Sequence, residues 1–190
     1  SGEVVERDDS DINHGFHGLP GSGTIIERVW VERTLTGLIV GSTPQIPTDG
    51  LIIRDSRFRT LFADGINVNG GSSNVIIENN HFRYTGDDAL ASWSSNHGTP
   101  SGTNSNNRFQ NNVVQLPWRA NCFAIYGGAN NRIENNLCLD TITYPGIFLA
   151  SQFESDPFSG TTIIRNNRLV RAGGPMWSNQ YGAITLLADE

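Results

Sequence analysis

A short phrase recurs along the chain and constrains its fold more than any other feature. Its first position is an apolar residue and its second is variable. Its third position is usually Asn or Asp, and two variable residues and a second apolar residue follow. The six instances read IIERVWV, IIRDSRF, IIENNHF, RFQNNVV, RIENNLC and IIRNNRL, in which the first apolar position is Ile26, Ile53, Ile77, Phe109, Ile133 and Ile164. A period of roughly 24 to 32 residues is typical of solenoids, in which each repeat forms one coil and stacks on the next.

Each phrase is followed by a second short alternation of apolar residues, for example at residues 66–68, 123–125 and 147–149. None of these segments has the apolar period of a helix. Short β-branched runs between Asn-rich turns predict an all-β fold, namely a right-handed parallel β-helix (solenoid) of about six coils. Coils stack ~4.8 Å apart, so equivalent residues form columns in which Asn side chains can satisfy one another and the backbone. A leucine-rich repeat solenoid is the alternative, but it needs a pattern dominated by Leu.

The repeats also suggest a domain boundary. We expect residues 1–22 to form an N-terminal lead-in segment and residues 23–190 to form the β-helix, with extra residues at 41–50, 93–107 and 151–160 stacking into one rim. The sequence stops directly after the sixth repeat without an evident polar cap, which solenoid ends normally need. The β-helix is therefore expected to be either a whole domain or a piece of a larger one that further chain segments or subunits complete.

Composition excludes several classes of function. The net charge of −6 disfavours a nucleic acid or an anionic membrane as partner. Every basic residue is Arg, so chemistry that needs a lysine Schiff base or a P-loop lysine is excluded. Cys122 and Cys138 allow one disulfide or two buried thiols, and nothing in the sequence fits a zinc site.

Two repeats carry acids at the same place. Asp64 follows Ile53 at the same distance as Asp88 follows Ile77, so the two should share a column on adjacent coils, with Asp87 one column over. Like charges this close raise at least one pKa, and a protonated acid beside ionised carboxylates is what glycoside hydrolysis requires. Two other interpretations stay open: turn-forming Asp residues without chemistry, and a structural calcium site.

Side chains near these acids are candidates for binding a sugar. Aromatic rings can stack on sugar rings, and Arg, Asn and His can bind hydroxyl groups. The candidate substrate-binding residues are Trp93, His97, Trp118, Arg119, Asn121, Tyr144, Trp177 and Tyr181. We expect no bound metal at the site and no cofactor, with structural calcium as the alternative use of the acids.

Two segments resemble a known family. They read HGFHGLPGSGTIIERVWVERT and LFADGINVNGGSSNVIIENNHFRYTGDDALASWS. They are similar to glycoside hydrolase family 87, the α-1,3-glucanases and mycodextranases, most clearly from about His14 to Ser95 and more weakly to about Tyr181. The site layout also resembles that of dextranases and polygalacturonases, but the Gly-His-Gly and Arg-Ile-Lys motifs of polygalacturonases are missing, so a neutral glucan fits better.

The resemblance implies a parallel β-helix that hydrolyses an α-glucan with inversion. It implies that Asp87 is the general acid and that Asp64 and Asp88 hold and deprotonate the attacking water. An inverting pair of carboxyl groups is expected to lie ~6.5–9.5 Å apart. A polymeric substrate implies secretion to the extracellular space. Two alternatives remain: a polysaccharide lyase, and a carbohydrate-binding β-helix or inactive fragment without catalysis.

Overall fold

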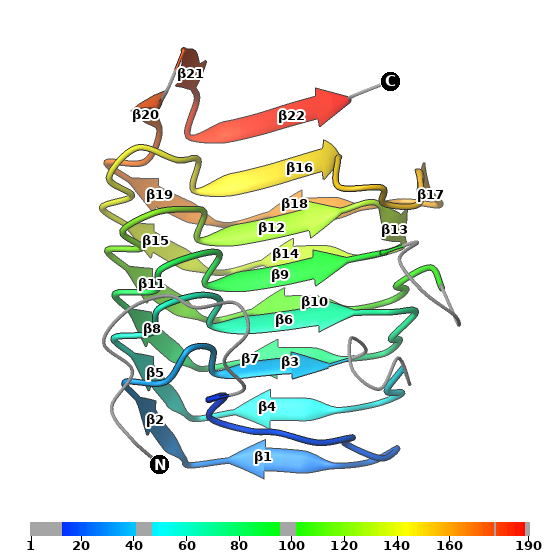
Figure 1. Ribbon diagram of the computed structural model, residues 1–190. Helices are drawn as coiled ribbons and strands as arrows, with labels where there is room; N and C mark the ends of the chain where they lie inside the picture. The colour runs from blue at the N-terminus through cyan, green and yellow to red at the C-terminus, as the bar shows by residue number, and fades with distance from the viewer. Residues whose placement is uncertain (1–12, 41–46, 96–101, 177, 189–190) are drawn as a thin grey trace.

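The computed structural model describes residues 13–40, 47–95, 102–176 and 178–188. The chain winds into a right-handed parallel β-helix with three long parallel sheets (Figure 1). Each sheet receives one strand from each of six coils, which confirms the fold expected from the repeats. The leucine-rich repeat alternative is wrong, because the described residues form strands and turns and no helix. No described segment is a helix long and apolar enough to cross a membrane.

The three sheets are named here in the order in which each coil enters them. The first sheet contains β1 (Ile25–Glu27), β4 (Ile52–Arg54), β7 (Ile76–Glu78), β10 (Arg108–Gln110), β14 (Arg132–Glu134) and β18 (Ile163–Arg165). The second sheet contains β2 (Trp30–Glu32), β5 (Arg57–Arg59), β8 (His81–Arg83), β11 (Val113–Gln115), β15 (Leu137–Leu139) and β19 (Arg168–Val170). The third sheet contains β3 (Leu38–Val40), β6 (Ile66–Asn69), β9 (Leu90–Trp93), β12 (Phe123–Tyr126), β16 (Ile147–Ser151) and β22 (Ile184–Ala188).

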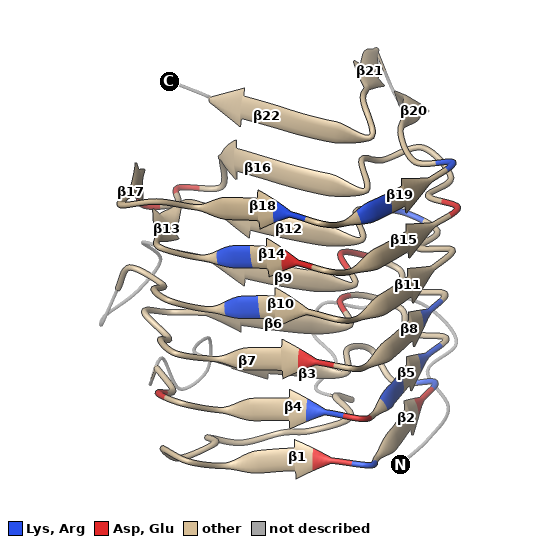
Figure 2. Cartoon of the chain, turned by 180° about the vertical axis from the view of Figure 1, so that it is seen from behind, with Lys and Arg blue, Asp and Glu red and all other residues tan. Residues whose placement is uncertain are grey.

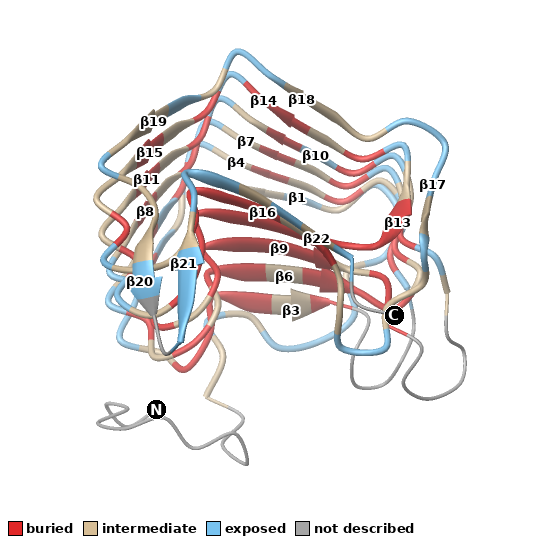
Figure 3. Cartoon of the chain, turned by 90° about the horizontal axis from the view of Figure 1, so that it is seen from above, coloured by how far each residue is buried: buried red, intermediate tan, exposed pale blue. Residues whose placement is uncertain are grey.

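The recurring phrase forms the first two strands of each coil, and its apolar residues fill the interior. The middle residue of each of these strands points inward, because side chains alternate along a strand. Ile53 and Phe58 are fully buried in this way, and Phe58 stacks on Phe82 of the next coil with ring centroids 4.9 Å apart. The core is therefore one continuous column along the axis (Figure 3).

The Asn-Asn pairs that lie at the corner between the first and second sheets have two separate roles. The first Asn of each pair has a positive φ, for example 56° at Asn79 and 56° at Asn111, a conformation that Asn tolerates better than most residues. The second Asn points inward and joins a buried ladder. In this ladder Asn112 donates to the carbonyl of Ile77 and accepts from the backbone N–H of Asn80, as the stacked columns predicted.

Cys122 and Cys138 form a disulfide between neighbouring coils, which settles the choice that the sequence left open. Both residues are fully buried. The lead-in segment also contributes to the fold, since Phe16 makes a parallel bridge to Leu38 and so adds a short rung below β3.

Loops at the end of the third-sheet strands lie together where they are described. An antiparallel bridge joins Ser95 and Ser155, which belong to the extra residues of two different coils, and β13 (Gly128–Ala129) pairs with β17 (Phe158–Ser159). Residues 41–46 and 96–101 of the expected rim lie outside the described part. The last coil carries an antiparallel hairpin of β20 (Gly174–Met176) and β21 (Asn179–Tyr181) before it enters β22.

Candidate active site

The three sequence-predicted acids meet where the chain passes from the second sheet into the third. Asp64 lies two residues before β6, and Asp87 and Asp88 directly precede β9. Ile66 of β6 pairs with Leu90 of β9, so Asp64 and Asp88 occupy the same column, as their spacing predicted. One carboxylate oxygen from each of the three Asp residues lies within 4.8 Å of the others.

Asp88 is held by three donated hydrogen bonds in a buried position. Its Oδ1 accepts from the backbone N–H of Asn121 at 3.0 Å and from the Asn121 side-chain amide at 2.7 Å. Its Oδ2 accepts from the hydroxyl of Tyr126 at 2.8 Å. Burial, and then the negative charge of Asp87, raise the pKa of Asp88 to about 7, and the three donors oppose this rise.

Asp87 is the more accessible of the adjacent pair. Its side chain is 27% exposed, and the guanidinium of Arg119 lies 3.9 Å from its Oδ2. This contact is long for an ion pair, and Arg119 is itself partly exposed. Asp87 also accepts a hydrogen bond from the backbone N–H of Asp88.

The acids lie in a groove of about 870 Å³ on the outer face of the third sheet. In the view along the axis this sheet forms one side of the molecule, and the β20–β21 hairpin extends beyond it (Figure 3). The groove is lined by Asp64, Asn67, Asp87, Asp88, Trp93, Arg119, Ala120, Asn121, Tyr126, Tyr144, Phe148, Gln152, Phe153, Glu154, Asn179 and Tyr181. Charged and polar groups therefore share the groove with many aromatic rings, a lining suited to sugars, whose rings have apolar faces and polar edges.

The aromatic rings of the groove pack against one another. Tyr144 and Tyr181 stack with ring centroids 5.5 Å apart. Tyr126 meets Phe148 and Phe153 edge to face, with centroids 6.0 Å and 5.4 Å away. Such pairs favour fixed ring positions. The groove is thus a preformed surface.

Five of the eight predicted substrate-binding residues line the groove, namely Trp93, Arg119, Asn121, Tyr144 and Tyr181. Trp118 does not: it is exposed, and its ring packs beside Gly86 in the preceding turn. His97 and Trp177 lie outside the described residues.

Sequence reasoning missed several groove residues, of which Tyr126 is the most important. The others are Asn67, Ala120, Phe148, Gln152, Phe153, Glu154 and Asn179. A signal for Tyr126 was present, because it pairs in register with Trp93, which was predicted, and so shares its outward direction. Gln152, Phe153 and Glu154 come from a loop whose path the repeat does not fix.

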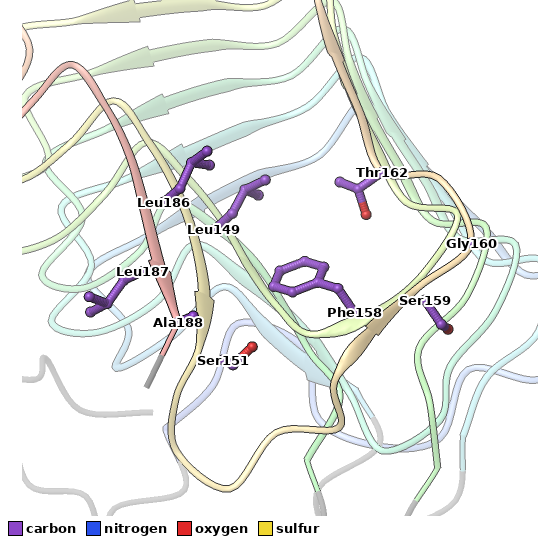
Figure 4. A pocket seen from close by; sticks show the side chains of 9 residues that line it. All are labelled: Leu149, Ser151, Phe158, Ser159, Gly160, Thr162, Leu186, Leu187 and Ala188. Carbon is purple, nitrogen blue, oxygen red and sulfur yellow. The ribbon is translucent and has the colours of Figure 1, made fainter. Parts of the chain in front are cut away.

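Two further observations limit what the site can be. Among the described residues, the three Asp residues also form the one cluster of possible metal ligands, and carboxylate oxygens suit Ca²⁺. A second cavity of about 420 Å³ lies beside β16, β17 and β22, and its lining residues carry no titratable side chain (Figure 4). Of these two cavities, only the groove is lined by titratable side chains.

The sequence matches the model of a known protein family. Residues 18–185 match the family model of the α-1,3-glucanase catalytic domain D2. Comparison of the sequence with curated proteins finds no match.

Solved structures agree with the family model. A catalytic-domain variant of a GH87 α-1,3-glucanase in complex with tetrasaccharides is 29% identical, with a TM-score of 0.86 over 96% of this chain and 34% of that one. The Agl-KA catalytic domain is 34% identical, with a TM-score of 0.86 over 93% of this chain and 32% of that one. The catalytic unit of the thermostable GH87 α-1,3-glucanase from Streptomyces thermodiastaticus strain HF3-3 is 32% identical, with a TM-score of 0.85 over 96% and 33%. The chain thus spans about a third of the length of the solved chains it matches.

Proposed function

Because the chain belongs to glycoside hydrolase family 87, the α-1,3-glucanase catalytic domains, we propose that it hydrolyses α-1,3-glucosidic bonds of an α-glucan. The observation that carries this proposal is the meeting of Asp64, Asp87 and Asp88 in an aromatic-lined groove. Hydrolysis of a glycosidic bond needs one proton donor and one activated water, and three carboxyl groups can supply both.

Features of the similar structures support this assignment. One GH87 catalytic domain is in complex with nigerose and another with tetrasaccharides. Four of these structures are single Asp-to-Ala variants, at three different positions. Two of the positions are adjacent, and they follow the third at the same distances as Asp87 and Asp88 follow Asp64.

The environment of each carboxyl group suggests its role. Both oxygens of Asp88 already accept hydrogen bonds, from Asn121 and Tyr126, which favours the ionised form in the reacting complex. We therefore assign Asp88, together with Asp64 in the same column, to holding and deprotonating the attacking water. Asp87 is more accessible and is assigned to donating a proton to the leaving oxygen.

The stereochemical course is the part of the proposal that most needs a direct test. We propose inversion, with the water held by Asp64 and Asp88 on the face opposite Asp87. One oxygen from each acid lies within 4.8 Å of the others, whereas whole carboxyl groups are ~6.5–9.5 Å apart in typical inverting enzymes and ~5–5.5 Å apart in retaining ones, so retention is the alternative that the test must exclude. NMR of the first product released from α-1,3-glucan decides between them, because inversion gives the β-anomer and retention the α-anomer.

Substrates with different leaving groups test the three roles. The Asp87→Asn variant should lose hydrolysis of glucan but keep turnover of an α-nigerosyl fluoride, because fluoride leaves without a proton. Asp64→Asn and Asp88→Asn should lose both activities. Asp140→Asn, which removes an acid paired with Arg171 on the surface, is the matched control. Full activity in all three groove variants would refute the proposal.

The place of action and the need for ions are part of the same proposal. Because a polymeric glucan does not enter cells, we propose that the protein acts outside the cell. The three acids are assigned to proton transfer and not to a structural calcium ion, so hydrolysis should persist in the presence of a chelator.

A further inference from the structure

The outer face of the second sheet carries a group of side chains that hydrolysis does not use. We call Trp30, Arg57, Arg59, His81 and Arg83 the arginine face. They are outward residues of β2, β5 and β8, whose middle residues point into the core, and Glu32 is the one acidic outward residue of these strands. Figure 2 shows blue positions on β5 and β8, on a different sheet from the one that carries the groove.

Like charges are stacked in register on this face. Arg59 of β5 pairs directly with Arg83 of β8, and adjacent strands lie ~4.8 Å apart. Like charges directly opposite each other destabilise a sheet.

The first sheet shows that the fold can avoid this repulsion. There the equivalent outward column begins Glu27, Arg54, Glu78, so that opposite charges alternate. Arg54 forms an ion pair with Glu27 at 2.8 Å. The repulsion on the arginine face is therefore not imposed by the solenoid.

The arginines are held by aromatic rings instead of by acids. The guanidinium carbons of Arg57 and Arg59 each lie 5.4 Å from the centroid of the Trp30 ring, and that of Arg83 lies 4.6 Å from the Tyr84 ring. Within the described part of the chain none of the three arginines forms an ion pair, although Glu32 is in register with Arg59. Stacking fixes the planar groups and leaves their positive charge uncompensated.

His81 adds no charge of its own at neutral pH. Burial and the three neighbouring arginines lower its pKa, against a hydrogen bond with Gln115 that raises it. Its Nδ1 lies 3.1 Å from Nη2 of Arg59, a spacing in which the arginine donates and the neutral ring accepts. The Nε groups of Arg59 and Arg83 are buried without a hydrogen-bond partner, and Nη2 of Arg83 donates to the hydroxyl of Tyr84 at 2.9 Å. A ligand on the surface would therefore bind the remaining Nη hydrogens of these guanidinium groups.

We propose that the arginine face is a second binding site, separate from the groove, for an acidic polysaccharide. Its carboxylate or sulfate groups would bind the forks of Arg57, Arg59 and Arg83, which match such planar or tetrahedral anions. A sugar ring would pack on Trp30, which is 59% exposed. The column runs along the solenoid axis, so a linear chain meets basic groups on successive coils.

The overall charge favours this ligand over a nucleic acid. The molecule carries a net charge of −6, which repels a densely charged polyanion once the contact extends beyond the few residues of this face. A short stretch of a more sparsely charged polysaccharide meets only the basic residues. The inference does not depend on hydrolysis in the groove.

Binding of the full chain to four probes tests the proposal: polygalacturonate, a lightly sulfated dextran, uncharged dextran and single-stranded DNA. We expect salt-sensitive binding to polygalacturonate, the lightly sulfated dextran or both, and which of them binds identifies the anionic group. Equal binding of uncharged dextran would overturn the role of the arginines. Equal binding of DNA would overturn the choice of a polysaccharide.

Substitutions on and off the arginine face test whether the polysaccharide binds there. The R57Q/R59Q/R83Q variant should bind the acidic polysaccharide at least about tenfold more weakly. The R28Q/R54Q/R108Q variant removes the same charge from other positions and should bind as the parent does. If the first triple variant fails to fold, Arg57→Gln and Trp30→Ala replace it, because both side chains are exposed. Unchanged affinity in folded variants would refute the proposal.

Discussion

Asp88 combines two demands that conflict at the scale of single residues. In its proposed role as a base it must be ionised, but it is only 3% exposed and lies next to Asp87. The hydrogen bonds from Asn121 and Tyr126 offset part of the cost of burying the charge. Native stability and proton transfer are therefore linked through this one carboxyl group.

Replacing Asp88 with Asn should make the protein more stable at high pH. In the folded state the pKa of Asp88 is raised from 3.8 to about 7. A raised pKa contributes stability below about pH 4 that is lost as the pH rises through about 7. Asp88→Asn should therefore gain about 3 kcal/mol over the parent between pH 4.5 and 8, measured by urea unfolding. Asp140→Asn should show no such gain, and an equal difference at both pH values for Asp88→Asn would contradict this account.

Replacing Tyr126 with Phe should shift the acidic limb of the pH profile of kcat/KM. Loss of the hydroxyl removes one donor to the Asp88 carboxylate, so its pKa rises further. A hydrogen bond to a charged group contributes about 1.5–3 kcal/mol, so the limb should move up by about 1–2 pH units. Tyr144→Phe changes a hydroxyl in the same groove and should leave the limb in place. A purely structural role of Tyr126 would lower the rate equally at all pH values.

These residues also show what the sequence could predict of the site. The shared column of Asp64 and Asp88 followed from equal offsets after equivalent residues of the repeat, because stacking converts sequence distance into position. Tyr126 was missed because a Tyr in a strand carries no sign of which acid its hydroxyl reaches. Trp118 does not line the groove, because a residue of the turn before the third sheet can point to either side of that turn.

At the scale of elements, Asn has two different roles at the corner between the first and second sheets: one forms the turn and the other joins the buried ladder. The exposed Asn111 adopts a φ of 56°, whereas its neighbour Asn112 is 1% exposed and bonded on both sides along the ladder. The repeat predicted the corner and the stacked Asn. It did not predict the β20–β21 hairpin, because those residues depart from the repeat.

A matched pair of substitutions distinguishes the turn role of Asn from its role in the buried ladder. Asn112→Ala should lower the free energy of unfolding by about 2–4 kcal/mol, because the N–H of Asn80 and the carbonyl of Ile77 lose their partner inside the core. Asn111→Gly should change it by less than about 1 kcal/mol, since Gly adopts positive φ freely. Chemical denaturation measures both, and equal losses would show that the buried ladder has no special role.

At the scale of the whole molecule, each coil contacts only its neighbours, so stability is passed along the axis. The Cys122–Cys138 disulfide is a covalent link between two successive coils beside the groove. Sequence alone left the two cysteines ambiguous, because neither lies in the recurring position of the other. They form a disulfide because the stacking of neighbouring coils brings the two cysteines together.

Removing this link should destabilise the protein measurably. The disulfide closes a loop of 16 residues, for which chain entropy gives about 3 kcal/mol. Cys122→Ala combined with Cys138→Ala should therefore lower the free energy of unfolding by about that amount, or somewhat more because Ala fills less of the core. Denaturation of the parent with and without reductant checks the result. No difference in either comparison would mean that packing alone holds these coils.

The shared register of the third sheet has a consequence for how such a groove can change over generations. Every coil adds one outward residue to each column of the floor, as Asn67, Ala91 and Ala124 do in succession. Duplicating the DNA that encodes one coil would lengthen the floor by a single step of ~4.8 Å and leave every other column aligned. If the groove holds a glucan as proposed, the length of sugar chain that it accommodates should grow with the number of coils.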